Sequence, residues 1–143
     1  MARLALALLG PLHVTLDDHP VTGFATDKVR ALLAYLTLEA RPHRRDALAE
    51  LLWPEQEAAA RTSLRVALTT LRRALGDQSA QPPFLLTTRE TVQFNPASNY
   101  TLDVTTFTDL LRESEQHAHP RGALCATCVA RLTEAVGLYR GEL

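Results

Sequence analysis

This sequence lacks most of the features that mark an extracellular or membrane protein. Its 143 residues include only two cysteines, too few for a disulfide framework. No run approaches the roughly 20 apolar residues that cross a bilayer. The apolar start, Met1–Leu9, is broken by Gly10-Pro11 and has no small-residue cleavage site, so it predicts a strand and not a secretory signal. These absences favour a cytoplasmic protein that has no disulfides and no membrane contact.

Catalytic motifs are missing as well. The sequence has no nucleophile elbow, no H-E-x-x-H pair and no paired carboxylates in a plausible pocket. It also has no G-x-x-x-x-G-K-[ST] phosphate loop, so we expect neither an enzyme nor a cofactor. The composition, 46% hydrophobic and 22% charged, is that of an ordinary globular protein. The length allows one domain and a fragment of another.

Positive charge is concentrated in one part of the chain, although the net charge is −1. Residues 26–76 hold nine Lys/Arg against six Asp/Glu, and Ala58–Gly76 holds four Arg and no acid. Such a local basic stripe is the usual footprint of phosphate binding. The alternative is a solvated helix face in a chain that favours Arg, because Lys28 is its only lysine.

Hydrophobic spacing predicts strands first, then three helices, a hairpin and two further helices. Polar, Gly and Pro residues separate these segments. In the second helix we expect Ala47, Leu48, Leu51 and Leu52 to be buried. The expected strands are Leu4–Leu9 and His13–Leu16; the three helices run from Thr26-Asp27 to Arg41-Pro42, over Arg44–Leu52 and over Arg61–Leu75; the hairpin pairs Phe84–Thr88 with Thr91–Phe94; the last helices are Leu102–Leu111 and Cys128–Arg140.

This order predicts an α+β fold, a winged helix-turn-helix. It would have an N-terminal antiparallel sheet, a three-helix core and a C-terminal β-hairpin wing, plus a short all-α C-terminal segment. We place the winged-helix domain at residues 1–97 and the helical segment at residues 98–143. The third helix is the clearest element. Its apolar stripe is Leu64, Leu68, Leu71 and Leu75, and Gly76 ends it.

If these leucines face the core, the opposite face of the third helix presents Arg, Thr and Val. Arg can donate two hydrogen bonds to guanine, Thr can bond base edges or phosphate, and Val can contact the thymine methyl group. Three Thr and a Val are poor choices for a merely solvated helix. We therefore expect the helix of about residues 58–75 to enter the DNA major groove. The candidate base-reading residues are Thr62, Arg65, Val66, Thr69, Thr70 and Arg73.

Phosphate contacts are expected from the flanks of this helix. Arg44 and Arg45 open the second helix, whose N-terminus offers backbone N–H groups to an anion. Arg89, at the hairpin tip, would reach a minor groove, unless it is a solvated turn residue paired with Glu90. Trp53 is expected in the core, with an indole N–H able to donate to a phosphate. The further candidates are Lys28, Arg61 and Arg72.

One cluster resembles a metal site. His117, His119, Cys125 and Cys128 place four potential zinc ligands within twelve residues, and C-x-x-C is a common half-site. An H-x-H pair converges on one metal only in an extended or turning backbone. We favour the alternative, in which the cysteines are small buried hydrophobes on one helix face, and we expect no metal. Elemental analysis of the purified protein distinguishes the two.

Three segments resemble a known family: "LALLGPLHVTLDDHPVTGFATDKVRALLAYLTLEA", "RRDALAELLWP" and "ARTSLRVALTTLRRALGD". They are similar to the OmpR/PhoB-type winged-helix domain of SARP/AfsR-like bacterial transcriptional activators, over about residues 3–96. The resemblance implies a DNA-binding transcription regulator whose protomers lie side by side on promoter direct repeats, with RNA polymerase as a further partner. It places the base-reading helix at Arg61–Arg73 and a phosphate-binding tryptophan at Trp53.

The tail, "YTLDVTTFTDLL…LTEAVGLYRGEL", resembles the opening of the bacterial transcriptional activator domain, a tetratricopeptide-like helical module. Only its first ~40 residues are present, fewer than stacked repeats need to bury a core. The resemblance therefore implies the N-terminal piece of a longer regulator. The alternative function is a winged helix that binds protein and not DNA, because the fold alone does not decide function.

Overall fold

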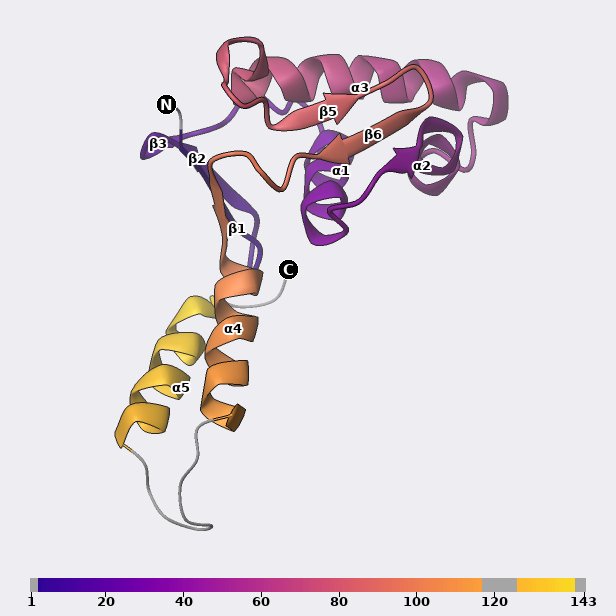
Figure 1. Ribbon diagram of the computed structural model, residues 1–143. Helices are drawn as coiled ribbons and strands as arrows, with labels where there is room; N and C mark the ends of the chain where they lie inside the picture. Colours follow the sequence, from indigo (N-terminus) through magenta and orange to yellow (C-terminus); the bar gives the residue numbers. More distant parts are fainter. Residues whose placement is uncertain (1–2, 117–125, 141–143) are drawn as a thin grey trace. The chain divides into compact units, whose positions relative to one another are not determined.

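The structure is a computed structural model that describes residues 3–116 and 126–140. Its elements follow the expected order of strands, three helices, a hairpin and two further helices (Figure 1). The α+β winged-helix architecture is therefore confirmed. Packing divides the chain into two units, Met1–Leu4 with Thr15–Tyr100 and Ala5–Val14 with Thr101–Leu143. The first unit holds the three-helix core and the hairpin.

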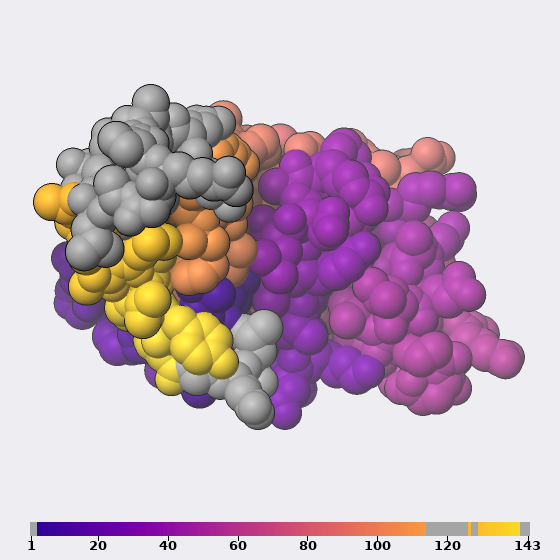
Figure 2. Space-filling view, turned by 90° about the horizontal axis from the view of Figure 1, so that it is seen from below, coloured from indigo at the N-terminus to yellow at the C-terminus, as the bar shows by residue number. Residues whose placement is uncertain are grey.

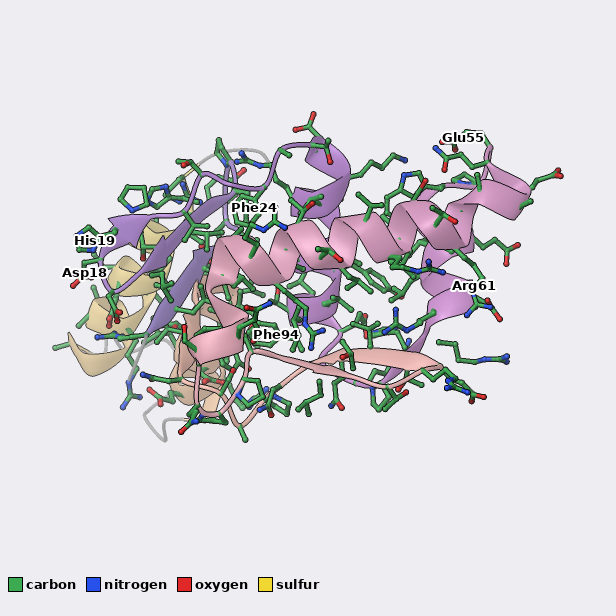
Figure 3. All side chains as sticks on the ribbon, turned by 90° about the horizontal axis from the view of Figure 1, so that it is seen from above. Asp18, His19, Phe24, Glu55, Arg61 and Phe94 are labelled. Carbon is green, nitrogen blue, oxygen red and sulfur yellow. The ribbon has the colours of Figure 1, made fainter. Side chains whose placement is uncertain are left out.

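The N-terminal sheet has four strands. They are β1 (Leu4–Ala7), β2 (His13–Leu16), β3 (His19–Pro20) and β7 (Tyr100–Leu102), in the order β3-β2-β1-β7. Asp17 and Asp18 form the β2–β3 turn with positive φ angles of 51° and 67°, which a tight hairpin turn requires and Asp tolerates. Figure 3 shows Asp18 and His19 at the outer end of this hairpin. The two expected strands are present as β1 and β2, and the sequence pattern predicted neither β3 nor β7 as a strand.

The first helix, α1 (Asp27–Leu38), begins at a capping residue. The Thr26 hydroxyl accepts a hydrogen bond from the Val29 N–H at 3.3 Å, and Asp27 places an acid in the first turn. Both features stabilise the partly positive N-terminus of a helix. The helix buries Val29, Leu32, Leu33 and Leu36, which recur at helical spacing and form its apolar face.

The second helix, α2 (Arg45–Leu52), buries fewer residues than expected. Leu48 and Ala49 are buried and Leu52 is half-buried, but Leu51 is 53% exposed and Ala47 is exposed. The expected burial of Leu51 and Ala47 is therefore wrong. At about 100° per residue, Leu48, Ala49 and Leu52 share one face, and Leu51 and Ala47 project away from it. Figure 2 shows the surface of α1, α2 and the following loop in violet and magenta.

The third helix, α3 (Ala60–Leu75), follows a short 3₁₀ turn, η1 (Glu57–Ala59). Leu64, Leu68, Leu71 and Leu75 are all buried, with 0–4% of their surface exposed. The helix ends at Gly76, whose left-handed conformation (φ 63°) lets its N–H donate to the carbonyls of Arg72 and Arg73. The expected leucine seam and its glycine stop are confirmed.

The hairpin belongs to a three-stranded sheet of order β4-β6-β5. Its members are β4 (His43–Arg44), β5 (Leu85–Thr87) and β6 (Thr91–Phe94). The Thr88 hydroxyl accepts the N–H groups of Glu90 (3.2 Å) and Thr91 (2.9 Å) and so closes the turn. The predicted hairpin is confirmed. The sequence pattern missed β4, because a two-residue strand has no periodicity of its own.

In the second unit, α4 (Asp103–Gln116) and α5 (Ala126–Leu138) pack against each other. The Asp103 carboxylate accepts the N–H groups of Leu8 (2.8 Å) and Leu9 (2.9 Å). The Arg140 guanidinium donates to the carbonyls of Ala7 (3.1 Å) and Pro11 (2.7 Å). Two charged side chains therefore hold the Leu8–Pro11 turn. Within the described ranges, none of the helices has the length and apolar character of a membrane span.

Gly10→Ala is expected to lower the free energy of unfolding by about 1–3 kcal/mol, because Gly10 combines a positive φ with close packing. Its φ is 129°, and an added Cβ would lie 2.9 Å from the Cβ of Arg140. The matched control is Gly137→Ala, since a Cβ at Gly137 meets nothing within 4 Å and Ala favours a helix. Urea denaturation of both variants measures the difference. Equal stability of the two would contradict the described Leu8–Pro11 turn.

Candidate nucleic-acid interface

The outward face of α3 carries the side chains expected there. Arg65, Thr69 and Arg73 are exposed, and Val66 is 61% exposed. Thr62 is also exposed, and Thr70 is half-buried. Figure 3 labels Phe94, at the end of β6, beside one end of α3, and Arg61 near the other end of this helix. The leucine seam thus turns the Arg and Thr side chains outward, as predicted from helical geometry.

The threonines of this face are already bonded to the helix backbone. The Thr69 hydroxyl donates to the Arg65 carbonyl (3.0 Å), and the Thr70 hydroxyl donates to the Val66 carbonyl (3.1 Å). Bonds of this kind accommodate Thr inside a helix. Each hydroxyl oxygen keeps lone pairs that can accept a hydrogen bond. These residues are therefore suited to accept from an amino group of a base while the helix stays intact.

Arginines from α2, α3 and the hairpin tip gather beside this face. Burial lowers the pKa of Arg45, and the positive charges of Arg61, Arg72 and Arg65 lower it further. The Arg45 Nε donates to the Thr88 carbonyl at 3.0 Å and holds the guanidinium in place. Because like charges held this close repel each other, the cluster favours a polyanion that would neutralise them.

A hollow of about 290 Å³ lies at one edge of the arginine cluster. Arg44, Arg61 and Arg89 line it together with two acids, Asp46 and Glu90. Arg61 pairs with Asp46 at 3.1 Å, but both side chains are about 60% exposed, so the pair contributes little stability. None of the ion pairs within the described ranges joins Arg89 to Glu90.

Trp53 lies beside α3, at a second hollow. The residue is 7% exposed, which confirms the expected core position, and its backbone N–H donates to the Ala49 carbonyl at 2.9 Å. With Lys28 and Val66 it lines a mostly apolar hollow of about 390 Å³ beside α3. The Lys28 ammonium donates to the Leu52 carbonyl at the end of α2, which leaves its other N–H groups for a further acceptor.

Arg72 is half-buried and has two side-chain partners. Its Nε pairs with Asp77 Oδ2 at 3.4 Å, and a terminal amino group donates to the Thr87 hydroxyl at 3.1 Å. The sequence analysis did not single out Asp77 and so missed this pair. The available signal was an acid placed directly after the glycine stop of a helix with two Arg in its last turn.

The structure brings together most of the candidates that the sequence singled out. The base-reading set lies on one helix face, and the phosphate set lies on its two flanks. The zinc hypothesis falls elsewhere: His117, His119 and Cys125, and the side chain of Cys128, lie outside the described residues. In the described part of the chain, no group of three His, Cys, Asp or Glu side chains could hold a metal ion.

Comparisons with known proteins agree with this geometry. The family model described as "Transcriptional regulatory protein, C terminal" matches residues 24–91. The transcriptional regulatory protein EmbR of Mycobacterium bovis and of Mycobacterium tuberculosis is 41% identical over 86 residues. That match covers 59% of this chain and 22% of the relatives, so the matched part spans about a fifth of their length.

A solved structure is similar over nearly the whole chain. The structure of Mycobacterium tuberculosis EmbR in complex with a low affinity phosphopeptide gives a TM-score of 0.75 at 29% identity, over 99% of this chain and 37% of that one. The match spans β1 to α5, so the fold of both units is shared with a regulator. Residues 24–91 are therefore a winged-helix DNA-binding domain of the OmpR/PhoB type, and they belong to a family of transcriptional regulators and not of enzymes.

Proposed function

We propose that this chain binds double-stranded DNA in a sequence-specific manner, with α3 in the major groove and the hairpin wing near the minor groove and backbone. The observation that carries the proposal is the outward face of α3. It is exposed, it contains Arg, Thr and Val but no acid, and arginines from two other elements flank it. A helix of this kind has the size and chemistry to read base edges.

The proposed base-reading residues differ in what they recognise. Arg65 and Arg73 present forked donors that suit guanine O6 and N7. Val66 offers methyl groups to thymine. The hydroxyls of Thr69 and Thr70 can accept from an amino group, because they already donate within the helix. Thr62 completes the set toward the start of α3.

The proposed phosphate contacts lie on both flanks of α3. On the side of the wing and of the start of α2, the proposed contacts are Arg44, Arg45, Arg61 and Arg89. Lys28 and Trp53 lie at the apolar hollow on the other side. Contacts on both flanks would set the register of the helix in the groove without reading sequence. Arg72 is already bonded to Asp77 and Thr87, and we propose a different role for it below.

We also propose the cellular setting that the family resemblance implies. Protomers would lie side by side on promoter direct repeats, contact RNA polymerase and act in the cytoplasm. Residues 1–97 would form the DNA-binding domain, and residues 98–143 would begin a helical activator domain. The similarity to EmbR, a transcriptional regulatory protein, supports this proposal.

Selection of bound fragments from random duplex DNA tests the proposed function. We expect a defined sequence with repeated half-sites to emerge. Its affinity should fall steeply between about 50 and about 200 mM salt, because phosphate contacts release counterions. A protein-binding winged helix would instead yield no enriched sequence and no salt-dependent DNA binding. That result would overturn the proposal.

Arg44→Ala is expected to weaken binding to all DNA sequences alike. No ion pair within the described residues engages Arg44, so its charge is available to a phosphate. Losing one phosphate contact should flatten the slope of log K against log salt by about 0.9. Arg44→Lys is the control, because it keeps the charge and should keep the slope. An unchanged slope in Arg44→Ala would remove Arg44 from the phosphate set.

A further inference from the structure

We propose that Asp77 and Arg72 are positioning residues that hold the wing at a set distance from α3, so that Arg72 acts on DNA binding through the wing and not by touching a phosphate. The inference rests on the proposed function, because it assumes that Arg89 at the wing tip contacts DNA. It concerns a buried carboxylate that the base-reading and phosphate sets do not use.

Asp77 joins the end of α3 to the start of the wing. It directly follows the left-handed Gly76, and only 3% of its side chain is exposed. Its Oδ1 accepts the N–H of Phe84 at 2.6 Å and the N–H of Leu85 at 3.3 Å. A carboxylate is buried at high cost unless it is paired and hydrogen-bonded, and here these partners meet that requirement.

Arg72 extends the same connection along the wing. Its Nε lies 3.4 Å from Asp77 Oδ2, and its terminal amino group donates to the Thr87 hydroxyl at 3.1 Å. One guanidinium on the last turn of α3 thus contacts Asp77, whose carboxylate holds the start of β5, and Thr87 at the end of β5. Arg suits this role because its planar fork presents several donors in fixed directions.

This connection to α3 matters for the wing because β5 is an edge strand of its sheet. In the order β4-β6-β5, β6 pairs with strands on both sides, whereas among the described residues β5 pairs with β6 alone. A hollow of about 560 Å³ lined by Arg72, Asp77, Leu85 and Thr87 lies beside it. Phe84 and Leu85 are buried at the start of the wing, and beside the hollow the polar contacts of Arg72 with Asp77 and Thr87 add a second connection between α3 and β5.

Double-mutant cycles with Arg89→Ala test this proposal on the full chain and the selected DNA. In the wild-type background we expect Arg89→Ala to weaken binding by roughly tenfold. In Asp77→Asn and in Arg72→Gln we expect the same change to cost less than roughly threefold, because the wing tip is no longer held against DNA. Thr87→Val, which removes only a hydroxyl, should give an intermediate loss of coupling and keeps the test valid if Asp77→Asn fails to fold.

Arg73→Gln is the matched control. It removes the neighbouring charge from α3 but touches neither Asp77 nor Thr87 in any hydrogen bond or ion pair of the described residues, so its effect should add to that of Arg89→Ala. Additive cycles for Arg72, Asp77 and Thr87 would overturn the inference and leave the proposed function standing. An Arg89→Ala variant that binds like wild type would do the same. If the wild-type chain bound no DNA, both proposals would fall.

Hydrogen exchange of the free protein gives a second readout. The amides of Phe84 and Leu85 should exchange faster in Asp77→Asn than in wild type, because their carboxylate acceptor loses its charge. The amides of α1 should keep their protection. Unchanged exchange at Phe84 and Leu85 would show that Asp77 does not hold the start of the wing.

Discussion

Leu68→Ala is expected to lower the free energy of unfolding by about 2–5 kcal/mol, the cost of removing a buried leucine side chain and leaving a cavity. Leu68 is 4% exposed, and its neighbours in the seam, Leu64 and Leu71, are 1% and 0% exposed. The seam holds α3 against α1 and α2, so little can move in to fill the space. Urea denaturation followed by circular dichroism measures the loss.

Val66→Ala is the control for this prediction. Val66 is also an aliphatic residue of α3, but it is 61% exposed, so its truncation should change stability by no more than about 0.5 kcal/mol. The same variant should weaken DNA binding if Val66 contacts a base. A harmless Leu68→Ala together with a destabilising Val66→Ala would mean that the orientation of α3 is reversed.

Arg65→Ala is expected to weaken binding to the selected DNA by about 1–3 kcal/mol and to relax the preference at one base pair. Arg65 lies on the exposed face of α3, one turn from Thr69, and its charge adds to the cluster that lowers the pKa of Arg45. A forked guanidinium can bond two acceptors of one guanine. Titration against the selected site and its single-base variants measures both effects.

Arg65→Lys separates base reading from charge. Lysine keeps the positive charge but loses the planar fork, so specificity should drop while the salt slope stays close to that of the wild type. If Arg65→Ala weakened binding to every sequence equally, Arg65 would be a phosphate contact. The assignment of the base-reading face would then move toward Val66 and Thr69.

Much of the candidate nucleic-acid interface was predictable because side-chain directions repeat with a fixed period along a helix. The leucines at Leu64, Leu68 and Leu71 can share a single face only in a helix, and this face is buried. Once it is assigned to the core, the direction of Arg65 and Val66 follows from geometry. No tertiary information was needed for this step.

The short second helix shows where the same reasoning fails. With eight residues, five of them Leu or Ala on several sides, α2 has no single apolar stripe. The sequence pattern therefore could not exclude Leu51, which is 53% exposed. Only the packing of Leu48 and Ala49 against neighbouring elements decides which face is buried.

The local sequence by itself determined the leucine seam of α3, the cap of α1 at Thr26 and the hairpin, because each depends on residues close together in the chain. The tertiary structure decided which long-range partners meet: Asp77 with Phe84, Arg72 with Thr87, and Arg140 with Pro11. The physical reason is that a hydrogen bond between distant residues depends on how whole elements pack, and no spacing in the sequence encodes that.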